Sequence, residues 1–290
     1  RVDRLKSNDK VRRVLSAVAL LLIALALSAC SMGGGAEATV DDAGSDIPVI
    51  TVTLGDDGLG VPAETPSGVV AIDPSAAPDA FIARLNDGVT TEQLTEALAS
   101  AQEDPTAALA LLSLLGGASN TTDGHLIVDL KPGTHAVVIL GEAGAQVATF
   151  TAGEASGATA PTPDVVVDLV DFNFAIPTEI SAGPKVWQIN NNGQQWHEMA
   201  IVKLSEGATV DDVLAMLASG EETDGPPPFE DVAFWAPNSP GETGYVTWDL
   251  PAGEYTVLCF LPDLTGDFSP HAAHGMVTMP EMTTNLNATP

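Results

Sequence analysis

Short apolar stretches separated by turn residues run through the second half of the chain. They are the expected strands, at residues 165–174, 185–189, 199–204, 244–250, 255–261 and 276–279. Residues 210–219 carry a helical pattern instead, and the proline-rich residues 225–229 end it. Short strands with turn sequences between them, such as Asn-Asn-Asn-Gly at residues 190–193, and with one helical excursion, predict a Greek-key β-sandwich.

The first half of the chain contains a copy of the same pattern. Residues 81–90 match residues 200–209 at an offset of 119, and residues 129–135 match residues 249–255 at an offset of 120. Two matched blocks at nearly one offset indicate a duplicated domain, because a period this long suits tandem domains and not a solenoid repeat.

The duplication predicts an all-β fold of two tandem Greek-key sandwiches, each with a helical insertion. In the first copy the insertion is expected at residues 91–100, and a second helical stretch at residues 105–115 is expected to stop at Gly116-Gly117. A segment rich in Gly, Ala, Thr and Pro, residues 153–163, separates the copies. We therefore expect two domains, at residues 47–155 and residues 160–290.

The start of the chain has the pattern of an export signal. Six of the ten basic residues lie in positions 1–13, and an uncharged apolar run of 14 residues follows at positions 14–27. That run is shorter than the ~20 residues of a membrane-spanning helix. A basic stretch before a short apolar one is typical of a secretory signal.

Residues 27–30, Leu-Ser-Ala-Cys, resemble the bacterial lipoprotein box, in which the cysteine is lipidated and becomes the first mature residue. The resemblance implies a signal peptide at residues 1–29 and a lipid on Cys30. Residues 30–46 are then a flexible tether, because Gly, Ser, Ala and acidic residues dominate them. We expect an exported protein anchored to the outer face of the cell membrane. A plain signal peptide and a short anchor helix are the alternatives.

Charge narrows the choice of partners. The formal net charge is −29, and after residue 13 only four basic residues remain against 37 acidic ones. Such a polyanion excludes a general affinity for nucleic acid. We expect a basic protein partner instead, with contact to the membrane through the lipid on Cys30. Adaptation to a saline exterior is the alternative explanation of the acidic charge.

One thiol and three imidazoles gather in the second half. With Cys30 lipidated, Cys259 is the remaining cysteine, and it stands in sequence between His197 and the pair His271 and His274. A thiolate and two imidazoles with a weak thioether suit copper in both of its oxidation states, whereas zinc is the main competitor for a Cys/His set. Taken singly, Cys259 and His197 are also compatible with inert core residues.

The order His197, Cys259, His271 and Met276 resembles the type 1 copper site of the cupredoxins, the superfamily of plastocyanin and azurin. Residues 196–199, Trp-His-Glu-Met, add to the likeness, which is to an exported bacterial group with a lengthened ligand loop. The chain departs from the usual family pattern because eleven residues separate Cys259 from His271, where the family has only a few.

The resemblance implies copper as the cofactor and His271 as the exposed ligand through which electrons leave. His274 is an alternate ligand, because His274 and Met279 have the same spacing as His271 and Met276. The implied ligand set is His197, Cys259, His271 and Met276.

The first copy lacks these residues. Pro78 and Ile139 stand where the second copy has His197 and Cys259, so we expect the first domain to bind no metal.

Together these inferences favour a membrane-tethered electron carrier whose partner is a redox protein. A copper-holding or copper-delivering lipoprotein, with a copper-exchange partner, and a metal-free interaction module of the same fold are the alternatives. The sequence contains no glycine-rich phosphate loop, serine elbow or paired carboxylates, and we therefore do not expect an enzyme.

Overall fold

The structure is a computed structural model. It describes residues 40–41, 47–56, 58–77, 80–100, 105–141, 144–219 and 226–284. The predicted signal peptide, Cys30 and most of the predicted tether lie outside these residues. Within the described ranges, no helix is long and apolar enough to cross a membrane. We call residues 47–155 the first half and residues 160–284 the second half.

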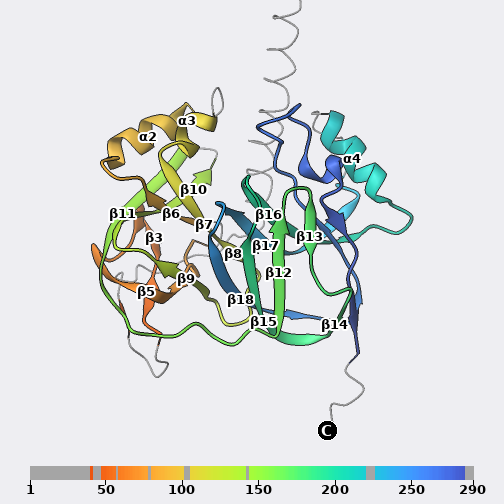
Figure 1. Cartoon of the computed structure of the whole chain (residues 1–290), viewed down its shortest axis with the longest axis horizontal. Helices are drawn as coiled ribbons and strands as arrows, with labels where there is room; N and C mark the ends of the chain where they lie inside the picture. The colour runs from red at the N-terminus through yellow and green to blue at the C-terminus, as the bar shows by residue number, and fades with distance from the viewer. Residues whose placement is uncertain are drawn as a thin grey trace, which may run out of the picture.

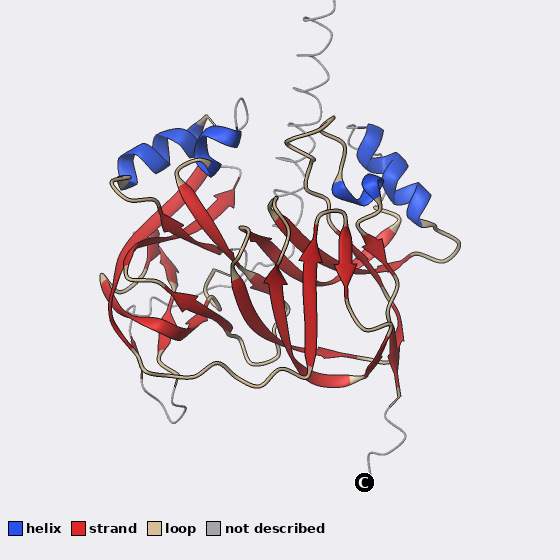
Figure 2. Ribbon diagram, viewed as in Figure 1, coloured by secondary structure: helices blue, strands red, loops and turns tan. Residues whose placement is uncertain are grey.

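Strands dominate both halves, and the helices lie together at one end of the molecule (Figures 1 and 2). The first half contains α2 (Thr91–Ala99), α3 (Pro105–Leu109), β2 (Val49–Thr51), β3 (Thr53–Gly55), β4 (Gly58–Gly60), β5 (Glu64–Asp73), β6 (Phe81–Leu85), β7 (Leu112–Gly116), β8 (Ala118–Ser119), β9 (Leu126–Leu130), β10 (Gly133–Gly141) and β11 (Gly144–Ala155), with β1 (Val40–Asp41) before it. The second half contains α4 (Val210–Ser219), β12 (Val165–Val170), β13 (Asn173–Ala175), β14 (Glu179–Ser181), β15 (Gly183–Asn191), β16 (His197–Leu204), β17 (Phe229–Asn238), β18 (Thr243–Leu250), β19 (Gly253–Glu254), β20 (Thr256–Leu258), β21 (Val277–Thr278), β22 (Glu281–Thr283) and the 3₁₀ helix η2 (His271–His274).

Two layers of strands form the second half. In one layer β15 pairs with β12 in parallel and with β18 antiparallel. In the other, β16 lies between β17 and β20, and β20 pairs with β21. Side chains alternate between core and solvent along β12, where Val165, Val167 and Leu169 are buried while Val166 and Val170 are exposed. The expected sandwich of short strands is therefore present.

The two halves share both layers. Strand β18 pairs with β9 of the first half, with Tyr245 opposite Ile127, and β17 pairs with β8, with Trp235 opposite Ala118. Trp235 is fully buried where the halves meet. A Cβ on Gly244 would lie 2.5 Å from its ring, so only glycine allows this close approach.

The helical insertions are confirmed in both halves, and both begin in the same way. Thr90 caps α2 in a capping box with Gln93. Thr209 and Asp212 exchange equivalent bonds at the start of α4: Thr209 N donates to Asp212 Oδ2 and Asp212 N donates to Thr209 Oγ1.

Two local expectations are wrong. Residues 105–115 are not one helical stretch: α3 ends at Leu109, and residues 112–116 form β7 because they pair with β6. The expected strand at residues 165–174 is also interrupted. It turns at Asp171 and Phe172, where Phe172 has a φ of 62°, and returns as β13. This turn becomes part of the candidate site.

Candidate metal centre

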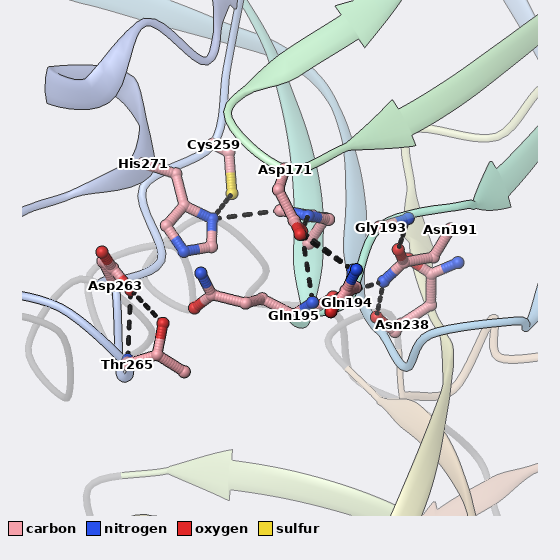
Figure 3. A network of polar contacts seen from close by, with 11 residues as sticks. Asp171, Asn191, Gly193, Gln194, Gln195, Asn238, Cys259, Asp263, Thr265 and His271 are labelled. Atoms are coloured by element: carbon pink, nitrogen blue, oxygen red, sulfur yellow. Dashed lines mark hydrogen bonds and ion pairs between the residues drawn. The ribbon is translucent and has the colours of Figure 1, made fainter.

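Three of the predicted ligands meet in the core of the second half. His197 is the first residue of β16, Cys259 directly follows β20, and His271 opens η2. Nδ1 of His271 lies 3.1 Å from Nδ1 of His197 and 3.4 Å from Sγ of Cys259, and the three donor atoms lie within 4.8 Å of one another (Figure 3). All three side chains are buried. The arrangement provides three soft or borderline donors that face one point.

Backbone hydrogen bonds close the loop that carries the last ligands. Ala272 N donates to Cys259 O at 2.9 Å, Met276 N donates to His271 O at 3.0 Å, and Cys259 N donates to Met276 O at 3.3 Å. The long spacing between Cys259 and His271 is accommodated because residues 262–270 form a separate turn, closed by a bridge between Pro262 and Pro270. The two ligands therefore stay adjacent despite the eleven residues between them.

Met276 is fully buried and belongs to the same core cluster as Cys259. Its backbone N–H and C=O both bond to the ligand loop, as described above. This position suits a core thioether beside a metal, and a thioether is the weak axial ligand of blue-copper sites.

Asp171 orients His197, and the sequence did not single it out. Nε2 of His197 lies 2.9 Å from Oδ1 of Asp171. A carboxylate can only accept, so Nε2 carries the proton and Nδ1 keeps a lone pair that faces Nδ1 of His271. The same carboxylate accepts the backbone N–H groups of Gln194 and Gln195. Although burial raises the pKa of Asp171, these hydrogen bonds hold its pKa below the usual range.

Burial keeps the three donor residues neutral in the metal-free chain. It lowers the pKa of His197, and together with the neighbouring His197 it lowers the pKa of His271 to about 4. Burial and the nearby Glu198 raise the pKa of the Cys259 thiol. Neutral imidazoles are the form that binds metals, whereas the thiol must release its proton when a metal enters.

Glu198 links the two strands that carry the first two ligands. Its buried Oε1 accepts the backbone N–H of Phe260 at 3.0 Å, so it joins the residue after His197 to the residue after Cys259. Burial raises the pKa of this carboxyl to about 7. The sequence showed Glu198 only as part of a motif and not as a structural link.

The structure separates His274, the alternate ligand, from the other donors. Nε2 of His274 lies 2.8 Å from Oγ of Ser269 and 3.2 Å from Oδ1 of Asp267. His274, Asp263 and Asp267 form a second set of donor atoms within 4.8 Å of one another, a set that does not include Cys259. Of the two registers that the sequence allowed, the structure brings His271, not His274, to the thiol.

His271 is not the exposed ligand that the resemblance implied. Only 1% of its surface is accessible, and the half-buried ring of Phe172 lies against it edge-on, with the ring centroids 5.2 Å apart. The cause is the turn after β12, which places Phe172 over the ligand loop. Electron exit directly through an exposed His271 is therefore excluded.

Both candidate groups of metal-binding side chains found in the described ranges lie in the second half. Ile139, which stands in place of Cys259, lies on β10 of the first half, and Pro78 falls outside the described residues.

Comparisons with known proteins were made for the whole chain. No protein-family model and no curated protein sequence matches it. Among solved structures it is similar to auracyanin A, a "blue" copper protein from Chloroflexus aurantiacus, with 23% identity over 41% of this chain and 96% of that chain and a TM-score of 0.29. It is also similar to auracyanin from Roseiflexus castenholzii, with 19% identity over 41% and 94% of the two chains and a TM-score of 0.28. A copper-containing nitrite reductase from Thermus scotoductus is 10% identical over 84% and 60% of the chains, with a TM-score of 0.24.

The comparisons correct one prediction. Copper nitrite reductases and multicopper oxidases are enzymes, and both are among the similar structures, which contradicts the prediction that the chain is not an enzyme. That prediction rested on missing phosphate, serine and carboxylate motifs. Those motifs say nothing about redox chemistry, in which the cofactor supplies the reactivity.

The fold class predicted from the sequence is confirmed. Two layers of short strands make the fold all-β, and the Cys/His/His group lies in the second half.

Proposed function

We propose that the chain is an exported copper protein that passes single electrons between protein partners while a lipid on Cys30 holds it at the outer face of the cell membrane. One observation carries the proposal: the donor atoms of His197, Cys259 and His271 lie within 4.8 Å of one another in the buried core. We assign these three residues, with Met276 as a weak fourth ligand, to copper.

The donor set fits the metal. Two imidazoles and a thiolate with a thioether accept copper in both oxidation states, and bound copper supplies one-electron exchange between Cu(I) and Cu(II). The chain's own residues hold the donor atoms in place: Asp171 orients His197, and the backbone bonds of the ligand loop hold His271 beside Cys259. Preorganised groups in a site closed to water lower the reorganisation that accompanies a change of charge.

The same features favour the electron carrier over the copper-delivering alternative. Delivery requires a ligand that a partner protein can reach, whereas His197, Cys259 and His271 are all buried. A metal-free interaction module has no need for a thiol and two imidazoles whose donor atoms face one point.

Charge supports a basic redox partner. With residues 1–29 removed, 37 acidic residues stand against four basic ones, and the resulting field attracts basic proteins and accelerates their association, an effect that salt weakens. The partner donates or accepts the electron, and the lipid anchor keeps the two proteins near one surface.

Copper loading of the purified chain from Ser31 onward tests the proposal. We expect one copper per chain and an intense visible thiolate-to-copper band, which Cys259→Ser abolishes while the control His125→Ala retains it. Zinc loading gives a colourless protein. A chain that stays colourless and holds no copper by metal analysis contradicts the proposal.

Cell fractionation tests the anchor. We expect the full chain in the detergent extract of the membrane and the Cys30→Ser variant outside it. If Cys30→Ser remains in the detergent extract, the protein is held by something other than a lipid on Cys30.

A further inference from the structure

We propose that the first half of the chain holds the segment that carries His197 in place and that Trp196 is the positioning residue through which it acts. This inference rests on the proposed function, because it assigns a task in that site to a half of the chain that was expected to bind no metal. It begins from the position of Trp196, which directly precedes His197.

The ring of Trp196 belongs to a core of the first half. It is half-buried and packs against a cluster whose other members, such as Leu94 and Val138, come from residues 81–147. Residue 196 is thus a side chain from the second half inserted at the edge of a first-half core. Pulling it out would expose apolar surface on both sides.

A hydroxyl group fixes the polar end of the same ring. Nε1 of Trp196 donates to Oγ of Ser239 at 3.0 Å, and Leu114 N of strand β7 donates to the same oxygen at 2.8 Å. Ser239 N in turn donates to Leu114 O at 2.8 Å. Ser239 and Leu114 are both buried, so these bonds have little competition from water. The indole is therefore tied to a first-half strand through a single side chain.

The segment of residues 194–197, which ends at His197, is held from two sides. On one side Asp171 accepts the N–H groups of Gln194 and Gln195 and the Nε2–H of His197, as the dashed lines of Figure 3 show in part. On the other side Trp196 lies in the first half. His197 cannot shift its backbone without disturbing one of these attachments. Metal sites need donor atoms within about 0.5 Å of the productive position, so the second attachment affects the site directly.

Trp248 provides a matched comparison. Its Nε1 donates to the backbone O of Ser119 in the first half at 2.9 Å, and its side chain is fully buried. It thus joins the two halves by a direct indole N–H bond, whereas Trp196 is joined to the first half through Ser239. However, it lies on β18, a strand that carries none of the proposed ligands. A change at Trp248 weakens the contact between the halves without altering a contact of residues 194–197.

The experiment compares Trp196→Ala, Trp196→Phe and Ser239→Ala with Trp248→Phe in the chain from Ser31 onward. In the copper-free protein, we expect the Trp196 variants to speed amide hydrogen exchange at residues 194–197 by about tenfold, and Trp248→Phe to leave it unchanged. In the copper-loaded protein, we expect Trp196→Ala to shift the visible band and the reduction potential while copper stoichiometry stays at one. Trp196→Phe keeps the ring, and it should therefore give a smaller shift.

Two results would overturn the inference: wild-type exchange and spectrum in both Trp196 variants, or an equal change in Trp248→Phe. Trp196→Phe and Ser239→Ala keep the test valid if Trp196→Ala does not fold. If the wild-type chain binds no copper, the proposed function fails. The exchange measurement on the copper-free chain still decides whether Trp196 restricts the motion of residues 194–197.

Discussion

Asp171 lies in the turn between β12 and β13, and its Oδ1 lies 2.9 Å from Nε2 of His197. This contact sets which nitrogen of His197 is free. Because the carboxylate occupies the Nε2 side, Nδ1 is the atom that faces His271 and Cys259. One acidic residue outside the predicted ligand set thus determines the tautomer of a ligand.

Removal of this carboxylate should weaken copper binding. We expect Asp171→Asn, which keeps one acceptor oxygen, to lower copper affinity by about tenfold, and Asp171→Ala to lower it by about 100-fold. Competition with a copper chelator measures both. Asp168→Asn is the control, because Asp168 lies on β12, just before the turn that contains Asp171, and accepts from Asn190 and Asn192 instead of His197. Equal affinities in all three variants would show that Asp171 does not position the ligand.

A methyl group at Gly193 should damage the same contact. A Cβ there would lie 2.5 Å from Oδ1 of Asp171 and 2.6 Å from Nε2 of His197, closer than side-chain atoms tolerate. We expect Gly193→Ala to reduce copper affinity by at least about tenfold. Gly55→Ala is the control, because a Cβ at Gly55 meets no atom within 4 Å. If chelator competition gives wild-type affinity for Gly193→Ala, the interaction between Asp171 and His197 is not needed for binding.

Alanine variants of His271 and His274 should decide which of these two histidines binds copper. We expect His271→Ala to lose the visible band, because its Nδ1 is one of the three clustered donor atoms. His274→Ala should keep both the band and the stoichiometry, because His274 bonds to Ser269 and Asp267 instead. Absorption spectra and metal analysis of the two proteins give the answer. The reverse pattern would make His274, and not His271, the ligand that binds copper together with Cys259.

The pattern of apolar residues was enough to predict the sandwich and the helices α2 and α4. In these elements buried and exposed positions repeat with the period of a strand or a helix, which is visible within a short stretch of sequence. Strand β17 was missed. Its partners come from both halves of the chain, with His197 and Leu115 both opposite Asn238, so its pairing is not visible in a local pattern. Strand β7 was predicted to be helical for the same reason, since its pairing with β6 outweighs the helix propensity of its Ala- and Leu-rich surroundings.

The donor residues could be named from the sequence because their types and order resemble those of a known family of copper sites. The residues that surround the donor residues could not be predicted from the sequence. Phe172 covers His271 only because its backbone adopts a positive φ, a conformation that few bulky residues adopt and that no pattern in the sequence indicated. Likewise, Trp196 and Asp171 reach the site through pairings between distant segments.

Acid should destabilise the copper-free chain through His135, a buried histidine of β10 whose ring stacks on Phe150. Burial lowers its pKa from 6.5 to about 4, with a smaller contribution from the charge of Arg84. Between about pH 6.5 and pH 4, His135 is therefore protonated in the unfolded chain but neutral in the folded chain. The stabilising effect is complete above pH 6.5 and is lost as the pH falls toward 4.

His135→Phe removes the titrating group and keeps a ring on Phe150. Between pH 7 and 4, we expect the wild type to lose up to about 3 kcal/mol more unfolding free energy than this variant in urea titrations. His197 and His271 titrate in both proteins, so their contributions cancel in the difference. Parallel stability curves for the two proteins would show that His135 accepts a proton in the folded state as readily as in the unfolded one.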